Sequence, residues 1–199
     1  MTLTRLALLL AVVGLLLWLL RDDTIVHGPG VVAPEQPLQS EAGIDEPFDL
    51  RGYTINPLAR FELTARVLGR EDYRLGREAD LSPLDLALGW GPMSDERVLE
   101  HIDIGQGGRW YRWSAATLPM PSREISRHSA NMHMIPIDDY IADKLDRARV
   151  GSIVRLRGQL VEVRAADGWH WRSSLSRDDT GARSCELVLV ERVSFTDAR

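Results

Sequence analysis

Residues 150–195 constrain the fold most, because their apolar side chains are spaced as in β-strands. Within residues 153–164 the apolar positions change from one face to the other beside Gly158, which predicts a bulge or bend in a strand of a small barrel. Residues 166–168, Ala-Asp-Gly, are typical of a hairpin turn. The successive apolar residues 187–190 predict a strand covered on both faces. We therefore expect a three-stranded meander whose long loop spans residues 173–183.

Five earlier stretches predict the remaining elements. Apolar and polar residues alternate over 60–68, which predicts a half-buried strand, and 109–113 predicts a second strand. Cap-like residues predict short helices over 82–88 and 94–101, and a helix with an apolar stripe over 138–149. The fold class that follows is α+β: an N-terminal transmembrane helix, then a small, mainly antiparallel, OB-like β-barrel with one packed helix.

The N-terminal residues predict contact with a membrane. Residues 6–20 carry no polar side chain, and Arg5 precedes them, whereas Arg21 is followed by two aspartates. We expect residues 1–21 to be a signal anchor or transmembrane helix, with a removed signal peptide as the alternative. Residues 22–47, rich in proline and glycine, predict a flexible linker, and residues 48–199 predict the folded domain. The protein is then expected in the inner (cytoplasmic) membrane as a single-pass protein, with this domain in the periplasm.

Charge and cysteine content exclude some functions. The chain has a formal net charge of −5, so we expect no nucleic acid as partner. Cys185 is the sole cysteine, which excludes an internal disulfide, and its place at the start of an apolar strand favours burial.

Polar-tipped and aromatic side chains gather around the loops next to the predicted strands. Such groups can form a cleft that holds a polar ligand or a peptide. The competing hypothesis is a polar network in the core that ties an irregular loop to the sheet. The candidate ligand-binding residues are Gln106, Arg109, Tyr111, Asn131, His133, Arg177 and Asp179.

The sequence contains residues suited to three kinds of chemistry, each of which has a plainer interpretation. Asp179-Thr180-Gly181 matches the loop of retroviral-type aspartic proteases, but the polar residues before it are typical of a turn. His128 and His133 are five residues apart, which is not a metal-ligand spacing on a helix. Cys185 with a histidine supplies the residue types of a thiol enzyme. We assign no catalytic residue, metal or cofactor from the sequence.

Three segments carry a resemblance to other proteins. Residues 86–95, 128–136 and 171–186 resemble those of a group of uncharacterised bacterial exported or membrane-anchored proteins, a likeness that implies no known activity. The plan of an anchor followed by a β-rich module is also similar to OB-type periplasmic proteins such as the haem chaperone of cytochrome c maturation. The His-x-x-x-Tyr of that family is absent from this chain.

The function expected from these features is that of a membrane-anchored, extracytoplasmic binding or interaction module. Its partners would be the membrane through the N-terminal helix, and a polar ligand, a peptide or another envelope protein. The alternatives are a thiol- or metal-dependent envelope hydrolase and a purely structural envelope component. Binding is favoured over catalysis.

Overall fold

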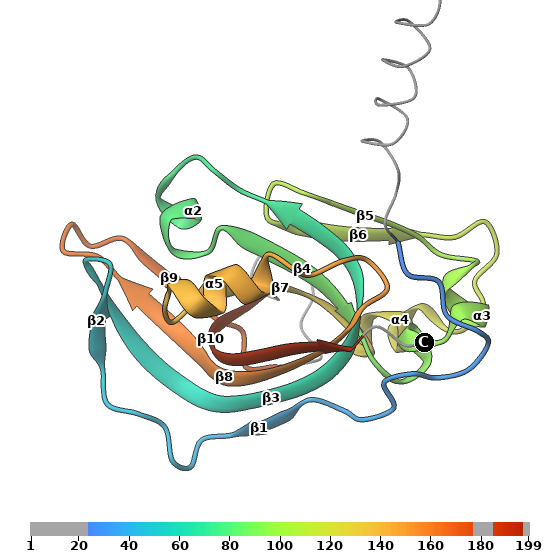
Figure 1. Ribbon diagram of the computed structural model, residues 1–199, viewed down its shortest axis with the longest axis horizontal. Coiled ribbons are helices and arrows are strands. Elements are labelled where there is room, and N and C mark those ends of the chain that lie inside the picture. Colours follow the sequence, from blue (N-terminus) through green and yellow to red (C-terminus); the bar gives the residue numbers. More distant parts are fainter. Residues whose placement is uncertain (1–23, 177–184, 197–199) are drawn as a thin grey trace, which may run out of the picture.

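The computed structural model describes residues 24–176 and 185–196. Its main feature is a ring of five paired strands (Figure 1). In spatial order the ring consists of β3 (Tyr53–Asp72), β4 (Leu84–Gly89), β7 (Ser129–Pro136), β10 (Glu186–Thr196) and β8 (Ile153–Arg164). A further pairing of β8 with β3 closes the ring. Neighbours are antiparallel except β7 and β10, which are parallel.

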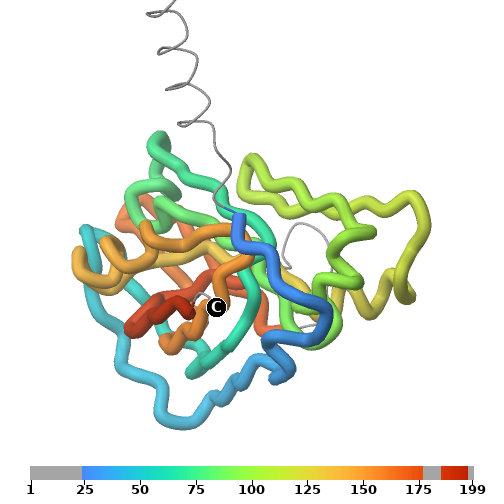
Figure 2. Tube along the Cα trace, turned by 45° about the vertical axis from the view of Figure 1, so that its right-hand side comes forward, coloured from blue at the N-terminus to red at the C-terminus, as the bar shows by residue number. Residues whose placement is uncertain are grey.

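Shorter strands extend or accompany this ring. They are β1 (Leu38–Ser40), β2 (Phe48–Leu50), β9 (His170–Arg172), β5 (Asp103–Gly107) and β6 (Trp110–Ser114). The strands β1 and β2 pair with β3, and β9 pairs with β8. The hairpin of β5 and β6 forms a separate two-stranded sheet, which Figure 2 shows beside the ring.

The helices of the described residues are short. They are α2 (Arg77–Leu81), the 3₁₀ turn η1 (Gly91–Ser94), α3 (Glu96–Leu99), α4 (Ser122–Arg127) and α5 (Asp139–Leu145). The longest of these described helices, α5, has seven residues. Within residues 24–176 and 185–196, none has the length and apolar character needed to cross a bilayer. The predicted anchor at residues 1–21 lies outside the described residues.

The predicted fold class is therefore wrong. The described chain is mostly β-sheet with a few short helices, not an α+β domain, and it does not show an N-terminal transmembrane helix. The coarser expectation of a barrel-like, partly closed sheet agrees with the ring of strands.

Apolar side chains fill the ring and also cover part of its outside. The interior cluster takes residues from all five ring strands and from α5. Val188 and Val190 point into this cluster, whereas Leu187 and Leu189 belong to a second cluster on the other face of β10. The prediction that residues 187–190 form a strand covered on both faces is confirmed.

Gly158 has a different role from the one predicted. The register shifts lie in the partner strands, between Val190 and Arg192 and between Pro57 and Ala59, and not in β8. The apolar pattern of β8 changes face because its second half is buried on both sides. A Cβ at Gly158 would collide with the carbonyl oxygen of Leu189, so glycine is needed for the close approach of β8 and β10.

The helix predicted over residues 82–88 is also wrong. Residues 84–89 form β4, while the helix α2 ends just before them. Leu84, Leu86 and Leu88 point into the ring interior with the period of two that a strand requires. Pairing with β3 on one side and β7 on the other outweighs the cap-like signal at the start of this segment.

Other predicted elements are confirmed with changed bounds. The strand over 60–68 lies within β3, and the expected hairpin joins β8 to β9. The N-terminus of α5 has the expected cap, since Asp138 Oδ1 accepts from the backbone N–H of Ile141 at 2.8 Å. The predicted meander is wrong, because β8 lies between β9 and β10 in the sheet and β9 does not pair with β10.

Much of the segment predicted as a linker lies against the ring. Its strand β1 pairs with β3, the side chain of Ala33 is buried, and the backbone N–H of Ile25 donates to Val150 O at 2.8 Å. The domain boundaries at residues 21 and 47 stay predictions.

Candidate functional site

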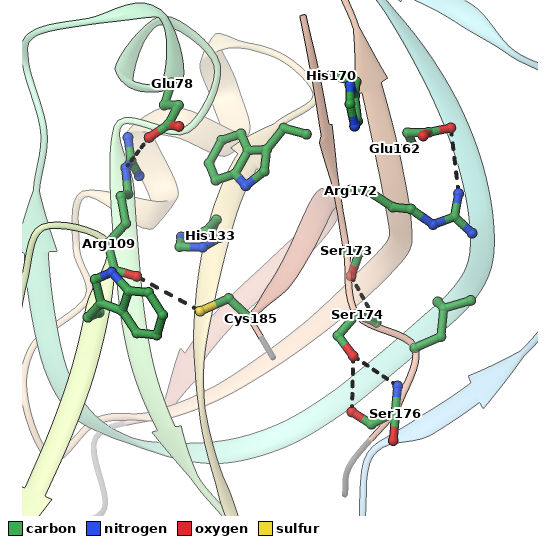
Figure 3. Close-up of a pocket in the computed structure, with 13 residues that line it drawn as sticks. Glu78, Arg109, His133, Glu162, His170, Arg172, Ser173, Ser174, Ser176 and Cys185 are labelled. Atoms are coloured by element: carbon green, nitrogen blue, oxygen red, sulfur yellow. Dashed lines mark hydrogen bonds and ion pairs between the residues drawn. The ribbon is translucent and has the colours of Figure 1, made fainter. Parts of the chain in front are cut away.

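The candidate site is a pocket of about 800 Å³ beside β7 and β9 (Figure 3). Its wall comes from α2, the β5–β6 turn, β7, the end of β8, and β9 with the residues that follow it. The lining residues are Glu78, Arg109, Trp110, His133, Glu162, His170, Trp171, Arg172, Ser173, Ser174, Leu175, Ser176 and Cys185. This volume suits a small ligand or a few residues of a peptide.

A buried carboxylate organises one side of the pocket. Asp85 is fully buried in β4, opposite His133 of β7 in the strand register. Its carboxylate accepts from Arg109 Nη1 at 2.7 Å and from Asn131 Nδ2 at 3.2 Å. A buried charge is tolerated only with such partners, so Asp85 fixes the side chains around it.

His133 also lies against Asp85. Its Nδ1 is 2.9 Å from Asp85 Oδ1, a distance typical of an ion pair, but the direction of this contact is not that of a hydrogen bond. Both side chains are almost completely buried, so the contact is shielded from water. The ring of His133 packs on Trp171 with centroids 4.8 Å apart, which places an aromatic pair on the pocket wall.

Arg109 connects the β5–β6 turn to the ring. It has a positive φ of 69°, a conformation that non-glycine residues seldom adopt and that is common in tight turns. Its guanidinium lies 3.8 Å from the ring centroid of Tyr73 and donates to Ser82 O at 2.8 Å, in addition to Asp85. Glu78 Oε2 is 3.6 Å from Arg109 Nε at the pocket rim. These contacts hold the Arg109 cation in one place.

The opposite wall carries a second group of charges. Glu162 of β8 lies 3.5 Å from Arg172 Nη1 and accepts from Arg164 at 3.0 Å. Both arginines are paired to this one carboxylate, which is mostly buried. The pocket therefore has a paired cation on each side.

The predicted site residues fall into three groups. Arg109 and His133 line the pocket. Gln106 and Asn131 lie behind it, where Gln106 Nε2 donates to Asn131 Oδ1 at 2.8 Å. Tyr111 is elsewhere, with its hydroxyl 2.8 Å from Ser129 Oγ, and burial raises its pKa to about 12.

The remaining two predicted residues, Arg177 and Asp179, lie outside the described residues. Within the described part, one polar network ties the hairpin to the sheet and also forms a pocket wall, while ligand binding by these residues stays a prediction.

Asp85, the centre of this network, is not among the site residues that the sequence predicts. The helix predicted over residues 82–88 includes Asp85, whereas the alternation of Leu84, Leu86 and Leu88 is the signal that places it on the opposite face of a strand. Glu78 and Glu162 are not among the predicted residues either, because Glu78 lies in a charged stretch and Glu162 stands between two valines of a strand, neither with distinctive spacing.

The structure also shows where the residues of the metal and thiol hypotheses lie. Among the described residues, no three histidine, cysteine or acidic side chains are grouped to hold a metal ion. Cys185, expected to be buried, is half-buried and lines the pocket together with His133. Its Sγ donates to the backbone oxygen of Arg109 at 3.8 Å, as Figure 3 shows.

Comparison with models of protein families, with curated proteins and with solved structures finds no match to this chain.

Proposed function

We propose that this protein is an extracytoplasmic binding module that holds a polar ligand or a peptide segment of an envelope partner in the pocket bordered by α2, β6 and β9. The observation that carries the proposal is the pocket of about 800 Å³ with polar groups fixed on one side and indole rings beside them. Groups held in place before binding lose little freedom when a ligand arrives, which favours affinity.

The fixed groups are Arg109 and His133, both held by the buried Asp85. Trp110 and Trp171 provide apolar surface in the same pocket, and Trp110 is 39% exposed. Side chains with this combination bind ligands that have both a polar and an apolar part. A peptide is such a ligand, because its backbone amides are polar and many of its side chains are apolar.

The position of the pocket in the strand order also supports binding. We propose that the ring is OB-like, with β3, β4, β7, β8 and β10 as its five strands in chain order. In OB folds the connections from first to second strand and from fourth to fifth strand bind ligands. The corresponding connections here contribute Glu78 from α2 and the described residues 170–176, all on the pocket wall.

The charges favour a peptide or a small polar ligand over a nucleic acid. Each arginine of the pocket already faces a carboxylate, Arg109 with Asp85 and Arg172 with Glu162. A polyphosphate carries several negative charges that would meet these carboxylates as well as the arginines, and a chain of net charge −5 would repel it.

We further propose that the domain works on the outer side of the inner (cytoplasmic) membrane. The apolar residues 6–20 support this, because a stretch of that composition directs a chain to a membrane. An alkaline phosphatase fused after residue 199 is expected to be active in living bacteria, and a cytoplasm-only fluorescent reporter at the same place is expected to be dark. The reverse pattern would contradict the proposed location.

One arrangement favours a second candidate, a thiol-dependent hydrolase. Cys185 and His133 line one pocket, and Asp85 lies against His133, as in a thiol-histidine-acid site. The thiol faces the backbone oxygen of Arg109, so binding stays the first proposal. Hydrolysis of p-nitrophenyl acetate that is lost in Cys185→Ser and kept in Trp110→Ser would favour the hydrolase instead.

Binding can be tested with a pool of synthetic tripeptides and the full chain in detergent micelles. Saturation-transfer NMR is expected to detect bound peptides, and Trp110→Ser is expected to weaken the signals. Tyr140→Ser is the matched control, because Tyr140 is 64% exposed on α5 and lies outside the pocket lining. Equal signals from both variants would place binding elsewhere and overturn the proposal.

A further inference from the structure

The strand β9 has a free edge within the described part of the chain. It is the last strand in the sheet order and pairs with β8 alone. The backbone N–H of Ser173 donates to Val161 O at 2.9 Å, and the N–H of Ala165 donates to Trp169 O at 2.9 Å. In an antiparallel pair, hydrogen-bonded and non-hydrogen-bonded positions alternate along each strand. The backbone N–H and C=O groups of residues 169, 171 and 173 therefore point toward β8. The N–H and C=O groups of His170 and Arg172 therefore face away from β8.

This free edge borders the pocket. Side chains alternate in a strand, so Trp171 points to one face of β9, and His170 and Arg172 point to the other. All three residues line the same pocket. The pocket therefore has lining residues with side chains on both faces of this edge strand, and it lies beside the backbone groups of His170 and Arg172.

The two sides of the pocket carry exposed groups of opposite charge. Glu78 on α2 has a side chain that is 45% exposed, and Arg172 on β9 has one that is 50% exposed. In Figure 3 these two residues lie on opposite sides of the pocket. Their position complements a ligand with a cationic group toward α2 and an anionic group toward β9.

We propose that the occupant of the pocket is an extended peptide that adds to β9 as a further strand, with a basic side chain near Glu78 and an acidic side chain near Arg172. Main-chain hydrogen bonds to His170 and Arg172 supply affinity, and alternate side chains of the peptide enter the aromatic part of the pocket. This inference rests on the proposed binding function and names the class of ligand.

The test uses heptapeptides that are acetylated at the N-terminus and amidated at the C-terminus. Valine is the central residue, lysine and glutamate are its two neighbours, and the other residues are threonine. Lysine and glutamate are placed on the same face of the extended peptide, in both orders. Two further peptides carry N-methyl groups at alternate residues, on one or the other edge of the extended chain. Only one of these two blocks the edge that would pair with β9.

The matched protein variants are His170→Pro and His170→Ala in the full chain. Proline removes the outward N–H of residue 170, and an edge strand tolerates it because that N–H makes no bond to β8. Alanine removes the imidazole and keeps the N–H. Circular dichroism and urea unfolding of His170→Pro check that the barrel is intact.

Strand addition predicts that one order of the charged residues binds more tightly than the other. It predicts that one N-methylated peptide loses about tenfold in affinity and the other does not, as expected for lost main-chain hydrogen bonds. His170→Pro is expected to lose about as much, and His170→Ala less. Amide hydrogen exchange at His170 and Arg172 is expected to slow when the peptide is bound.

Two outcomes overturn strand addition. If the peptides bind and Trp110→Ser weakens them, but N-methylation and His170→Pro have no effect, the pocket binds peptides through side chains alone and the proposed function stands. If neither order of the peptide binds, β9 does not accept a strand, and the tripeptide screen decides separately whether the pocket has a ligand.

Discussion

Asp85→Asn tests whether the buried carboxylate organises the candidate site. The substitution keeps the shape of the side chain and removes its charge. Asp85 is fully buried, and its Oδ1 lies 2.7 Å from Arg109 Nη1 and 2.9 Å from His133 Nδ1. Asparagine in its place leaves the mostly buried cation of Arg109 without its nearest negative charge.

The expected loss follows from the contacts that remain. Removing one partner of a buried ion pair costs about 3–5 kcal/mol of unfolding free energy. Arg109 keeps Glu78 at 3.6 Å and Ser82 O at 2.8 Å, so we expect the lower end of that range. With a urea dependence of about 2 kcal/mol per molar, a loss of about 3 kcal/mol lowers the unfolding midpoint by about 1.5 M.

The assay is urea unfolding of the full chain in detergent, followed by circular dichroism of the sheet. Asp103→Asn is the matched control, since Asp103 is exposed on β5, and its change should stay within about 0.5 kcal/mol. Arg109→Gln completes a double-mutant cycle, in which we expect a coupling energy of about 1–3 kcal/mol. A midpoint for Asp85→Asn equal to that of the control, or no coupling with Arg109, would refute this account of the network.

Substitutions at three further positions test other parts of the fold. The unchanged chain should lose unfolding free energy at high pH through ionisation of Tyr111, and Tyr111→Phe should remove this loss. The folded-state pKa of Tyr111 is raised to about 12, so its contribution to stability is complete below its unfolded pKa of about 10 and falls as the pH rises from there to about 12. Urea unfolding at pH 9 and pH 11 should give a smaller difference for Tyr111→Phe than for the unchanged chain, and an equal difference would contradict this. Gly158→Ala should lower the melting temperature strongly, because the added Cβ meets the carbonyl oxygen of Leu189 in the neighbouring strand; an unchanged melting temperature would show that the two strands can separate there. Asp138→Ala should cost about 1 kcal/mol through loss of the cap on Ile141, while Asp138→Asn should cost less, and equal losses would argue against a capping role.

The sequence predicts the elements whose signals are local. Residues 60–68 alternate cleanly and lie in β3, and Asp138 caps α5 as expected. Residues 187–190 are apolar without interruption, and both faces of that part of β10 are covered. In each case a few neighbouring residues carry the whole signal.

Features set by distant residues were out of reach. The pairing of β3 with β8 closes the ring, and no local pattern in either strand states that they meet. The helix-like start at Ser82 was followed to Leu88, but hydrogen bonds to strands on both sides make this segment β4. Such pairing outweighs local preference.

The sequence predicts only part of the candidate site, because the rest also depends on which strands pair. The gathering of polar residues near loops predicts Gln106, Arg109, Asn131 and His133, and these four residues do meet in one region. Asp85, which joins three of them, was missed because its role follows from the register of β4 against β7. Chain position alone does not give that register.

The most direct test of the central claim is a titration of the full chain with the tripeptide pool, followed by the indole N–H signals of its tryptophans. Trp110 and Trp171 line the pocket, whereas Trp90 is fully buried in the ring interior and serves as the internal reference. Binding in the pocket predicts saturable shifts of the Trp110 and Trp171 signals with Trp90 unchanged. Constant Trp110 and Trp171 signals at the highest peptide concentration would contradict the claim that this pocket binds a ligand of that class.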